Sequence, residues 1–521
     1  MVCWNGVDFT TRPPHTCMIP LLFVHRRVAV LRTALAIALI AAFSCATQVS
    51  ADEAALAGAG DIQTKYESET ERFRGELGEL AAWCRERKLE AEEVSLAGWL
   101  PNRAADKSYF FLIDSAAELA AESTGNADFA ARFTKLREAH AGRLFALAQA
   151  AAKEQEYSLA VKFVYETLRE QPHHPEAMKL LGYHLVDGKR LSTYELTKQR
   201  AGYVWHATYG WIKQDQVARY EKGERNIGGR WVSAADDAKI HATMRNPWYI
   251  DTENFRIATN HSLEEGVRLA TSLEKLNQVW RQLFARYHTP EAEWKRLFEG
   301  GEPRRDPARK LNNVVYYRTK AEYVNDLVKF EPLIGITSGI FLNRDDKAYF
   351  FADPEKNQDS FLFHEVTHQL FALAKRTLKV GERGNFWIVE GIACQMESLK
   401  LHDDFAELGG SDNPRMLAAR ARFKANYYMP LVDFTALSRD QLQKNPDIKA
   451  LYSQAAGLAS FLMYGEQGKY REATVDFLDA IYTNKDTPLT LTQRIGRSYS
   501  ELDADYRRYL ESLPGPVPEL K

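Results

Sequence analysis

The stretch Phe361–Leu370 contains the residues whose types and spacing are best suited to chemistry. His364, Glu365 and His368 stand there in the order His-Glu-x-x-His. Positions four residues apart lie on one face of an α-helix, one turn apart, so both imidazoles can reach the same metal ion. Glu365 lies beside them, where its carboxylate can take a proton from a metal-activated water. The stretch therefore indicates a metal site that activates water.

The rest of this stretch predicts a largely buried helix. Phe363, Val366 and Leu370 recur at helical spacing and form an apolar face. Asp359 and Ser360 precede it and are suited to cap its first turn. A five-residue motif also occurs by chance, and histidines often serve only as packed or surface residues. A third ligand is therefore needed to favour the metal site over that alternative.

Glu390 is the leading candidate for the third ligand. It lies in the next predicted helix, Asn385–Ala393, in which Trp387, Ile388 and Ile392 give an apolar face. Catalytic zinc often takes two histidines and one glutamate, which leaves a fourth position for water. A solvated charge on a surface helix is the alternative for Glu390. Its apolar neighbours argue against that, because carboxylates are rarely buried without a partner.

The two motifs, at residues 364–368 and 387–391, together resemble the gluzincin zinc peptidases, the thermolysin-like superfamily. They are more closely similar to uncharacterised secreted bacterial proteins called peptidase MA-like, in which helical repeats commonly precede the metal domain. The resemblance covers roughly residues 248–510. It implies a small sheet-bearing subdomain, the metal helix, and then a mostly helical subdomain.

The resemblance also implies roles for single residues. One Zn²⁺ ion would be held by His364, His368 and Glu390, with Glu365 as the general base. The Gly-x-Met-Glu-Asn motif of the gluzincin aminopeptidases is missing, which favours an endopeptidase over an aminopeptidase. The extended histidine motif of metzincins is absent as well.

Two further residues are candidates for supporting roles. Attack of water on a carbonyl needs a donor for the oxyanion that forms. Gluzincins often use a Tyr or His from the helical subdomain, and Tyr452, at the start of a predicted helix, is the best match. The alternative for Tyr452 is a buried phenol bonded only to backbone. Glu397 lies on the same helix face as Glu390 and could orient a ligand histidine, or be a simple surface residue.

The N-terminus is typical of a secretory signal. Arginines precede the apolar run Thr33–Phe43, which is shorter than the roughly 20 residues that span a bilayer. Small residues then offer a cleavage position near Ala51. We therefore expect residues 1–51 to be a signal peptide and the mature protein to be periplasmic or extracellular. An uncleaved membrane anchor is the alternative.

The composition is that of an ordinary globular protein. The 521 residues allow two or three domains with real cores, and 45% are hydrophobic and 26% charged. The formal net charge of −2 gives no indication of nucleic-acid binding. After loss of the signal peptide only Cys84 and Cys394 would remain, and two separate thiols are expected rather than a disulfide framework.

Residues 52–244 are predicted to form a helical, tetratricopeptide-like domain, which could bind a protein partner. The helix pair after residue 156 resembles one tetratricopeptide unit, whereas a stable array needs about three. The predicted helices are Ile62–Arg87, Lys107–Ala121, Ala127–Lys153, Tyr157–Arg169 and Pro175–His184.

Two segments in this half resemble each other, Val186–Tyr194 and Ile227–Ala235. Each combines a glycine turn, a basic residue, a bulky residue and a small hydroxyl residue suited to cap a helix. The favoured interpretation is two ordinary turn-and-cap elements, and the alternative is a duplicated docking element. The aromatic cluster between them, Tyr203, Trp205, Tyr209 and Trp211, is expected to pack in the core, and an exposed patch for a partner is the alternative.

Residues 245–513 are predicted to form the gluzincin-like domain, followed by a loose tail over 514–521. The whole chain is expected to be α+β and mainly α. Strands are predicted over 254–260, 313–317, 339–342 and 348–351, and helices over 263–287, 416–427, 433–443, 448–464, 470–482 and 499–513.

These observations favour an exported zinc-dependent hydrolase, a peptidase acting on peptide or protein substrates. A non-enzymatic helical-repeat binding or scaffold protein, with a degenerate or structural metal site, is the alternative. A third reading is a zinc hydrolase that acts on a non-peptide amide, because the motif reports water activation and not the leaving group.

Overall fold

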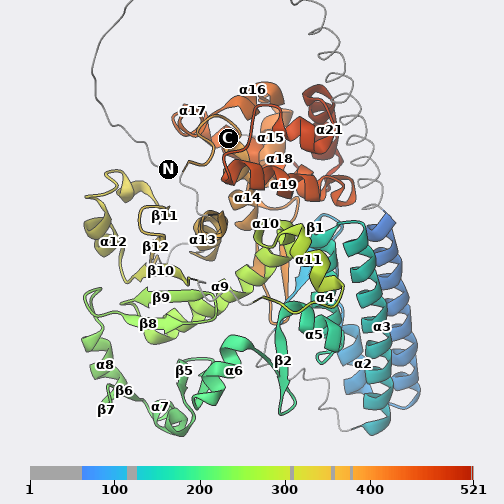
Figure 1. The fold of residues 1–521 in the computed structure, drawn as a ribbon, viewed down its shortest axis with the longest axis vertical. Helices are drawn as coiled ribbons and strands as arrows, with labels where there is room; N and C mark the ends of the chain where they lie inside the picture. The colour runs from blue at the N-terminus through green and yellow to red at the C-terminus, as the bar shows by residue number, and fades with distance from the viewer. Residues whose placement is uncertain are drawn as a thin grey trace, which may run out of the picture.

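The computed structural model describes residues 61–113, 126–304, 310–353, 358–375, 379–517 and 519. The expected signal peptide lies outside these residues. The described chain is mainly helical with small sheets, as the expected α+β, mainly α class requires (Figure 1). None of its described helices is both long enough and apolar enough to cross a membrane.

The N-terminal part is a stack of helices in which α3 packs along α4. The side chain of Asn126 accepts a hydrogen bond from the backbone N–H of Phe129 and so caps α3. Residues 61–86 are helical and are followed by α2 (Glu90–Ala97), α3 (Ala127–Lys153), α4 (Tyr157–Glu170) and α5 (Pro175–Leu181). The helices predicted over 62–87, 127–153 and 157–169 are confirmed.

The helix predicted over Lys107–Ala121 is wrong where the structure describes it. Lys107–Phe111 forms strand β1, which pairs antiparallel with β14 (Phe405–Gly409), and β13 (Lys400–Leu401) completes that sheet. Three successive aromatic residues at 109–111 favour a strand, and their pairing partner is distant in sequence. The first and second halves of the chain therefore share a sheet.

Three successive hairpin–helix units follow α5, where mostly helix was expected. The two echoed segments do form turn-and-cap elements, since Ser192 and Ser233 each accept a backbone N–H of the following helix. A third unit lies between them and was not foreseen. The units are β2 (Tyr183–Val186), β3 (Lys189–Ser192) and α6 (Thr193–Arg200); β4 (Tyr203–His206), β5 (Gly210–Lys213) and α7 (Val217–Glu221); and β6 (Glu224–Ile227), β7 (Arg230–Ser233) and α8 (Ala234–Ile240).

A five-stranded sheet lies beside the metal helix in the order β11-β12-β10-β9-β8. Its three central strands are parallel to one another, and the two outer strands are antiparallel to their neighbours. The strands predicted at 254–260, 313–317, 339–342 and 348–351 are confirmed within a residue or so. Their bounds are β8 (Trp248–Asp251), β9 (Phe255–Thr259), β10 (Asn312–Tyr317), β11 (Gly339–Leu342) and β12 (Lys347–Phe351).

One hydrophobic core joins this sheet to the helices around it. Figure 1 shows α13 between the five-stranded sheet and the C-terminal helices. The helix expected over 433–443 is divided in two. The helices are α9 (Leu263–Leu283), α10 (Ala285–His288), α11 (Glu291–Phe298), α12 (Lys320–Leu327), α13 (Gln358–Lys375), α14 (Phe386–Met396), α15 (Pro414–Lys424), α16 (Leu431–Ala436), α17 (Arg439–Gln443), α18 (Ile448–Tyr464), α19 (Arg471–Tyr482), α20 (Thr490–Ile495) and α21 (Tyr499–Ser512).

Two smaller expectations concern the cysteines and the tail. Cys84 and Cys394 are both buried and free, as expected for two separate thiols. The tail is held at its start, because the Arg420 guanidinium donates hydrogen bonds to the carbonyls of Leu513, Pro514 and Gly515.

Candidate metal centre

Helix α13 presents both histidines of the motif on one face. Phe363, Val366 and Leu370 are buried in the core, as their spacing predicted, so the opposite side of the helix faces away from it. On that side the Nε2 atoms of His364 and His368 lie 3.2 Å apart. Their side chains remain 12% and 16% exposed, so the pair can be reached from solvent.

Helix α14 brings the carboxylate of Glu390 to the same place. Its Oε2 lies 3.4 Å from Nε2 of His364 and 3.6 Å from Nε2 of His368. The side chain is buried, which excludes the alternative of a solvated surface charge. Asn385 stands at the N-terminal end of α14, but its side chain does not cap the helix and instead donates to Asp486.

The position of α14 depends on Gly391, the residue after the candidate ligand. A Cβ built on Gly391 would lie 2.5 Å from the carbonyl oxygen of Ala455 on α18. Helices α14 and α18 therefore approach more closely than any side chain at position 391 would allow. This close approach fixes the helix that carries Glu390, and it also brings the start of α18 toward the site.

The three donor atoms fit a small tetrahedral ion. A tetrahedron with bonds of about 2.0–2.1 Å, the lengths typical of zinc with nitrogen and oxygen, has edges of roughly 3.3 Å. The three separations of 3.2, 3.4 and 3.6 Å match one face of such a tetrahedron. His364, His368 and Glu390 thus form a group able to hold a metal ion.

Glu365 follows His364 on α13, and its carboxylate is hydrogen-bonded to the five-stranded sheet. Its Oε2 accepts a hydrogen bond of 2.9 Å from the backbone N–H of Phe341 on β11. Since this N–H donates to Glu365, it does not donate to β12 and must lie on the outer edge of β11. The carboxylate of Glu365 therefore stands at the free edge of the five-stranded sheet.

Tyr452, at the start of α18, is also brought to the site. Its phenol lies beside the carboxylate of Glu390, so its surroundings are not backbone alone, as in the alternative considered from the sequence. Burial, followed by the nearby carboxylate of Glu390, raises the pKa of Tyr452 well above its usual value. The phenol is therefore a neutral hydrogen-bond donor beside the candidate metal ligands.

Glu397 supports His364 from the other side of the imidazole ring. Its Oε1 lies 2.9 Å from Nδ1 of His364, as a carboxylate that orients a metal-bound histidine would. Arg415 on α15 donates two hydrogen bonds of 2.8 Å to the same carboxylate. No sequence signal marks Arg415, because nothing in its local pattern identifies it as a partner of a residue on another helix.

A second group of possible ligands shares His364 and consists of His364, Cys394 and Glu397. Arg415 lies against it, with its guanidinium bound to both oxygens of Glu397. A metal cation placed there would have to displace or repel that guanidinium. We therefore read the second group as a hydrogen-bonded support for His364.

The site is strongly coupled electrostatically. Burial alone lowers the pKa of His364, but hydrogen bonds with Cys394 and two carboxylates outweigh burial and hold its pKa well above the usual value. Burial raises the pKa of Glu390, but His368 and His364 outweigh that and hold it well below its usual range. Burial likewise opposes the shift at Glu397, where His364 and Arg415 lower the pKa to about 2. Protons held here would be released when a metal ion binds.

Comparison with models of known protein families gives no match for this chain, and comparison with curated proteins gives none either. The functional assignment therefore rests on the residues of the site and their geometry.

Proposed function

We propose that this chain is a zinc-dependent hydrolase, a peptidase of the gluzincin type with endopeptidase rather than aminopeptidase activity. The observation that carries the proposal is the triangle of His364, His368 and Glu390, whose donor atoms are spaced as one face of a zinc tetrahedron. Three protein ligands leave the fourth corner for water or substrate, which is the arrangement of catalytic zinc sites and not of closed structural ones.

The residues of this chain then divide the chemistry between them. His364, His368 and Glu390 would hold the zinc ion, which would supply a bound water with a pKa of about 7 and a positive charge to polarise a carbonyl. Glu365 takes the proton of the attacking water and later gives it to the leaving amine. Because the N–H of Phe341 holds its Oε2, we assign proton transfer to Oε1. The Tyr452 phenol donates a hydrogen bond to the oxygen on which negative charge develops.

The free edge of β11 favours a peptide over other amides as substrate. β11 is the outermost strand of the five-stranded sheet, and its outer edge lies at Glu365. An extended peptide can add to such an edge through backbone hydrogen bonds, which would align its carbonyl groups beside the base. The protein would act outside the cytoplasm if residues 1–51 are a signal peptide, and the N-terminal helices could bind a protein partner.

The test compares the wild-type protein with Glu365→Gln, each saturated with Zn²⁺, on quenched fluorescent peptides and on unfolded casein. We expect both proteins to bind one zinc ion, and Glu365→Gln to lose about 10²–10⁴-fold in kcat/KM. A chelator should abolish the wild-type activity, and zinc should restore it. Zinc bound without cleavage of any peptide would favour the non-enzymatic binding protein. Cleavage only of non-peptide amides would favour the third reading.

A further inference from the structure

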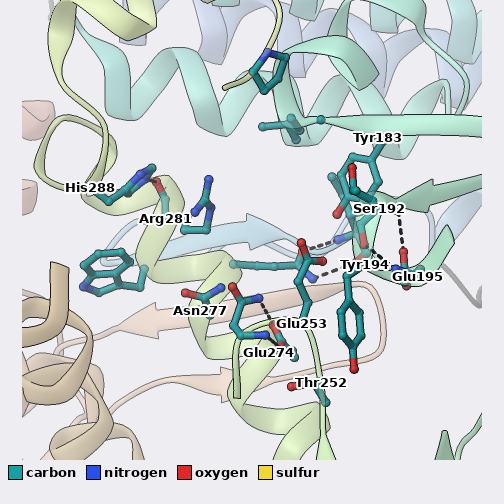
Figure 2. A pocket seen from close by; sticks show the side chains of 18 of the residues that line it. Tyr183, Ser192, Tyr194, Glu195, Thr252, Glu253, Glu274, Asn277, Arg281 and His288 are labelled. Atoms are coloured by element: carbon teal, nitrogen blue, oxygen red, sulfur yellow. Dashed lines mark hydrogen bonds between the residues drawn. The ribbon is translucent and has the colours of Figure 1, made fainter. Parts of the chain in front are cut away.

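A large cavity of the described chain lies outside the candidate ligand set and borders the end of α13 at Leu370–Ala374. It has a volume of ≈ 2300 Å³, and none of His364, Glu365, His368 or Glu390 lines it. Its walls come from the first two hairpin units, the turn between β8 and β9, and helix α9 (Figure 2). Small-molecule sites are typically about 300–1,000 Å³, so this cavity is large enough for a segment of a polymer.

The hairpin units provide an aromatic wall. Tyr183, Tyr194, Trp205 and Trp211 all line the cavity, and each remains partly exposed. Three of these rings contact one another edge to face, with centroids 6.0 Å apart for Tyr194 and Trp211 and 5.6 Å apart for Trp205 and Trp211. Aromatic rings that are partly exposed in a row offer flat faces on which a ligand can stack.

Helix α9 and the β8–β9 turn provide a polar wall opposite. Figure 2 shows Asn277 and Arg281 across the cavity from Tyr183 and Tyr194, with Glu253 between the two sides. No described residue forms a hydrogen bond or an ion pair with the carboxylate of Glu253. Asn277 is 5% exposed and likewise finds no hydrogen-bond partner among them. A nearly buried amide facing a cavity without a partner points to a ligand that supplies one.

Two further buried polar atoms beside the cavity have no partner in the described part of the chain. They are Oδ1 of Asn254 and Nε1 of Trp280, and both residues line the cavity. Buried donors and acceptors are nearly always paired, because an unpaired one has lost its hydrogen bonds to water. Acceptor and donor atoms of this kind are suited to hydroxyl groups, which both donate and accept.

We propose that this cavity binds a neutral oligosaccharide segment. A sugar ring offers an apolar C–H face, which suits the aromatic wall, and equatorial hydroxyl groups, which suit the amides and carboxylates of α9 and the turn. Acidic and basic side chains both line the cavity, so no strong field selects a polyanion.

The experiment measures binding of chitohexaose and cellohexaose, two neutral hexasaccharides, by calorimetry and by tryptophan fluorescence. It uses the Glu365→Gln protein as well as the wild type, so binding is read without turnover and independently of the proposed hydrolysis. We expect at least one hexasaccharide to bind and to change the fluorescence, because Trp205, Trp211 and Trp280 line the cavity. Asn277→Ala and Glu253→Ala should each weaken binding about tenfold or more.

Two comparisons keep the result decisive. Glu253 has no partner to lose, so Glu253→Ala should keep the wild-type melting temperature even if Asn277→Ala does not. Tyr249→Ala is the matched control, since Tyr249 is 64% exposed on β8 and does not line the cavity. The proposal is overturned if neither hexasaccharide binds at about 1 mM. It is overturned equally if Glu253→Ala and Tyr249→Ala bind alike, or if only a peptide probe depends on Glu253.

Discussion

Oε1 of Glu397 lies 2.9 Å from Nδ1 of His364, and Arg415 clamps that carboxylate with two hydrogen bonds. These hydrogen bonds link three side chains in series: His364 on α13, Glu397 at the end of α14, and Arg415 on α15. The imidazole is oriented so that its other nitrogen, Nε2, faces Glu390 and His368. In the candidate metal centre, Glu397 and Arg415 thus fix the side of the His364 ring that faces away from the other candidate ligands.

The first prediction concerns Arg415. Arg415→Ala should lower the affinity for zinc about 10- to 100-fold, because Glu397 loses the two bonds that hold it against His364. Zinc affinity is measured by competition with a chelating dye. Lys424→Ala is the control, since Lys424 is an exposed cation on the same helix. Equal zinc affinity in the two variants would show that Arg415 has no part in positioning the ligand.

The second prediction concerns Tyr452. Tyr452→Phe removes the phenol hydroxyl but keeps the ring, so kcat should fall about 10²–10³-fold if the hydroxyl stabilises the developing oxyanion. Zinc content should stay at one ion per chain, and KM should change much less than kcat. Tyr499→Phe serves as the control, because its hydroxyl binds the carbonyl of Pro488, away from the centre. An unchanged kcat in Tyr452→Phe would leave the phenol a structural partner of Glu390.

The third prediction concerns the helix contact that positions Glu390. Gly391→Ala would place a Cβ 2.5 Å from the Ala455 carbonyl oxygen, so α14 must shift. We expect a loss of about 1–3 kcal/mol in the free energy of unfolding, with weaker zinc binding.

Gly75→Ala is the matched control for that substitution. Gly75 is helical, and a Cβ there would meet nothing within 4 Å. It should therefore stabilise the protein by about 0.5–1 kcal/mol and leave zinc binding unchanged. If Gly391→Ala behaved like Gly75→Ala in urea unfolding, the α14–α18 contact would not be as close as described.

The fourth prediction concerns pH and Glu156, a buried acid that is not part of the candidate metal centre. Burial and the neighbouring carboxylate of Glu472 raise the pKa of Glu156 to about 8. In the unfolded chain a glutamate ionises near pH 4.3. Between these values the folded state holds the proton that the unfolded state has lost, so the contribution of Glu156 to stability falls as pH rises.

The free energy of unfolding of Glu156→Gln should therefore fall less than that of the wild type when the pH rises from about 5 to about 8. These two pH values lie near the ends of the interval between the two pKa values. Melting temperatures at the two pH values measure the difference. Glu154→Gln is the control, because Glu154 is exposed two residues away and should leave the wild-type slope unchanged. The same slope in all three proteins would mean that Glu156 is ionised in the fold.

The metal helix and the five-stranded sheet could be predicted because their signals are local. The motif on α13 sets its own geometry, and the β-branched and aromatic residues of β10 mark a strand without reference to its neighbours. Glu390 could be predicted because an acid inside an apolar helix demands a partner.

Other parts could not be predicted, for identifiable reasons. β1 depends on pairing with β14, which lies hundreds of residues later and is not visible in local periodicity. The strands of the hairpins have only four residues each. Two of the hairpins have turns in which both central residues have positive φ, at 187–188 and at 228–229. Such pairs are a signal for a hairpin, whereas from the sequence we interpret them only as turns. The turn of the middle hairpin, 207–209, has no such pair. Arg415 reaches Glu397 only through the packing of two separate helices.

The most direct test of the metal centre is X-ray absorption at the zinc edge of the purified, zinc-loaded protein. We expect one zinc per chain with nitrogen and oxygen ligands at about 2.0–2.1 Å, from His364, His368 and Glu390, and no sulfur. A sulfur neighbour at about 2.3 Å would place the ion on Cys394 and contradict the account. So would a protein that binds no zinc, or one whose zinc environment is unchanged in Glu390→Ala.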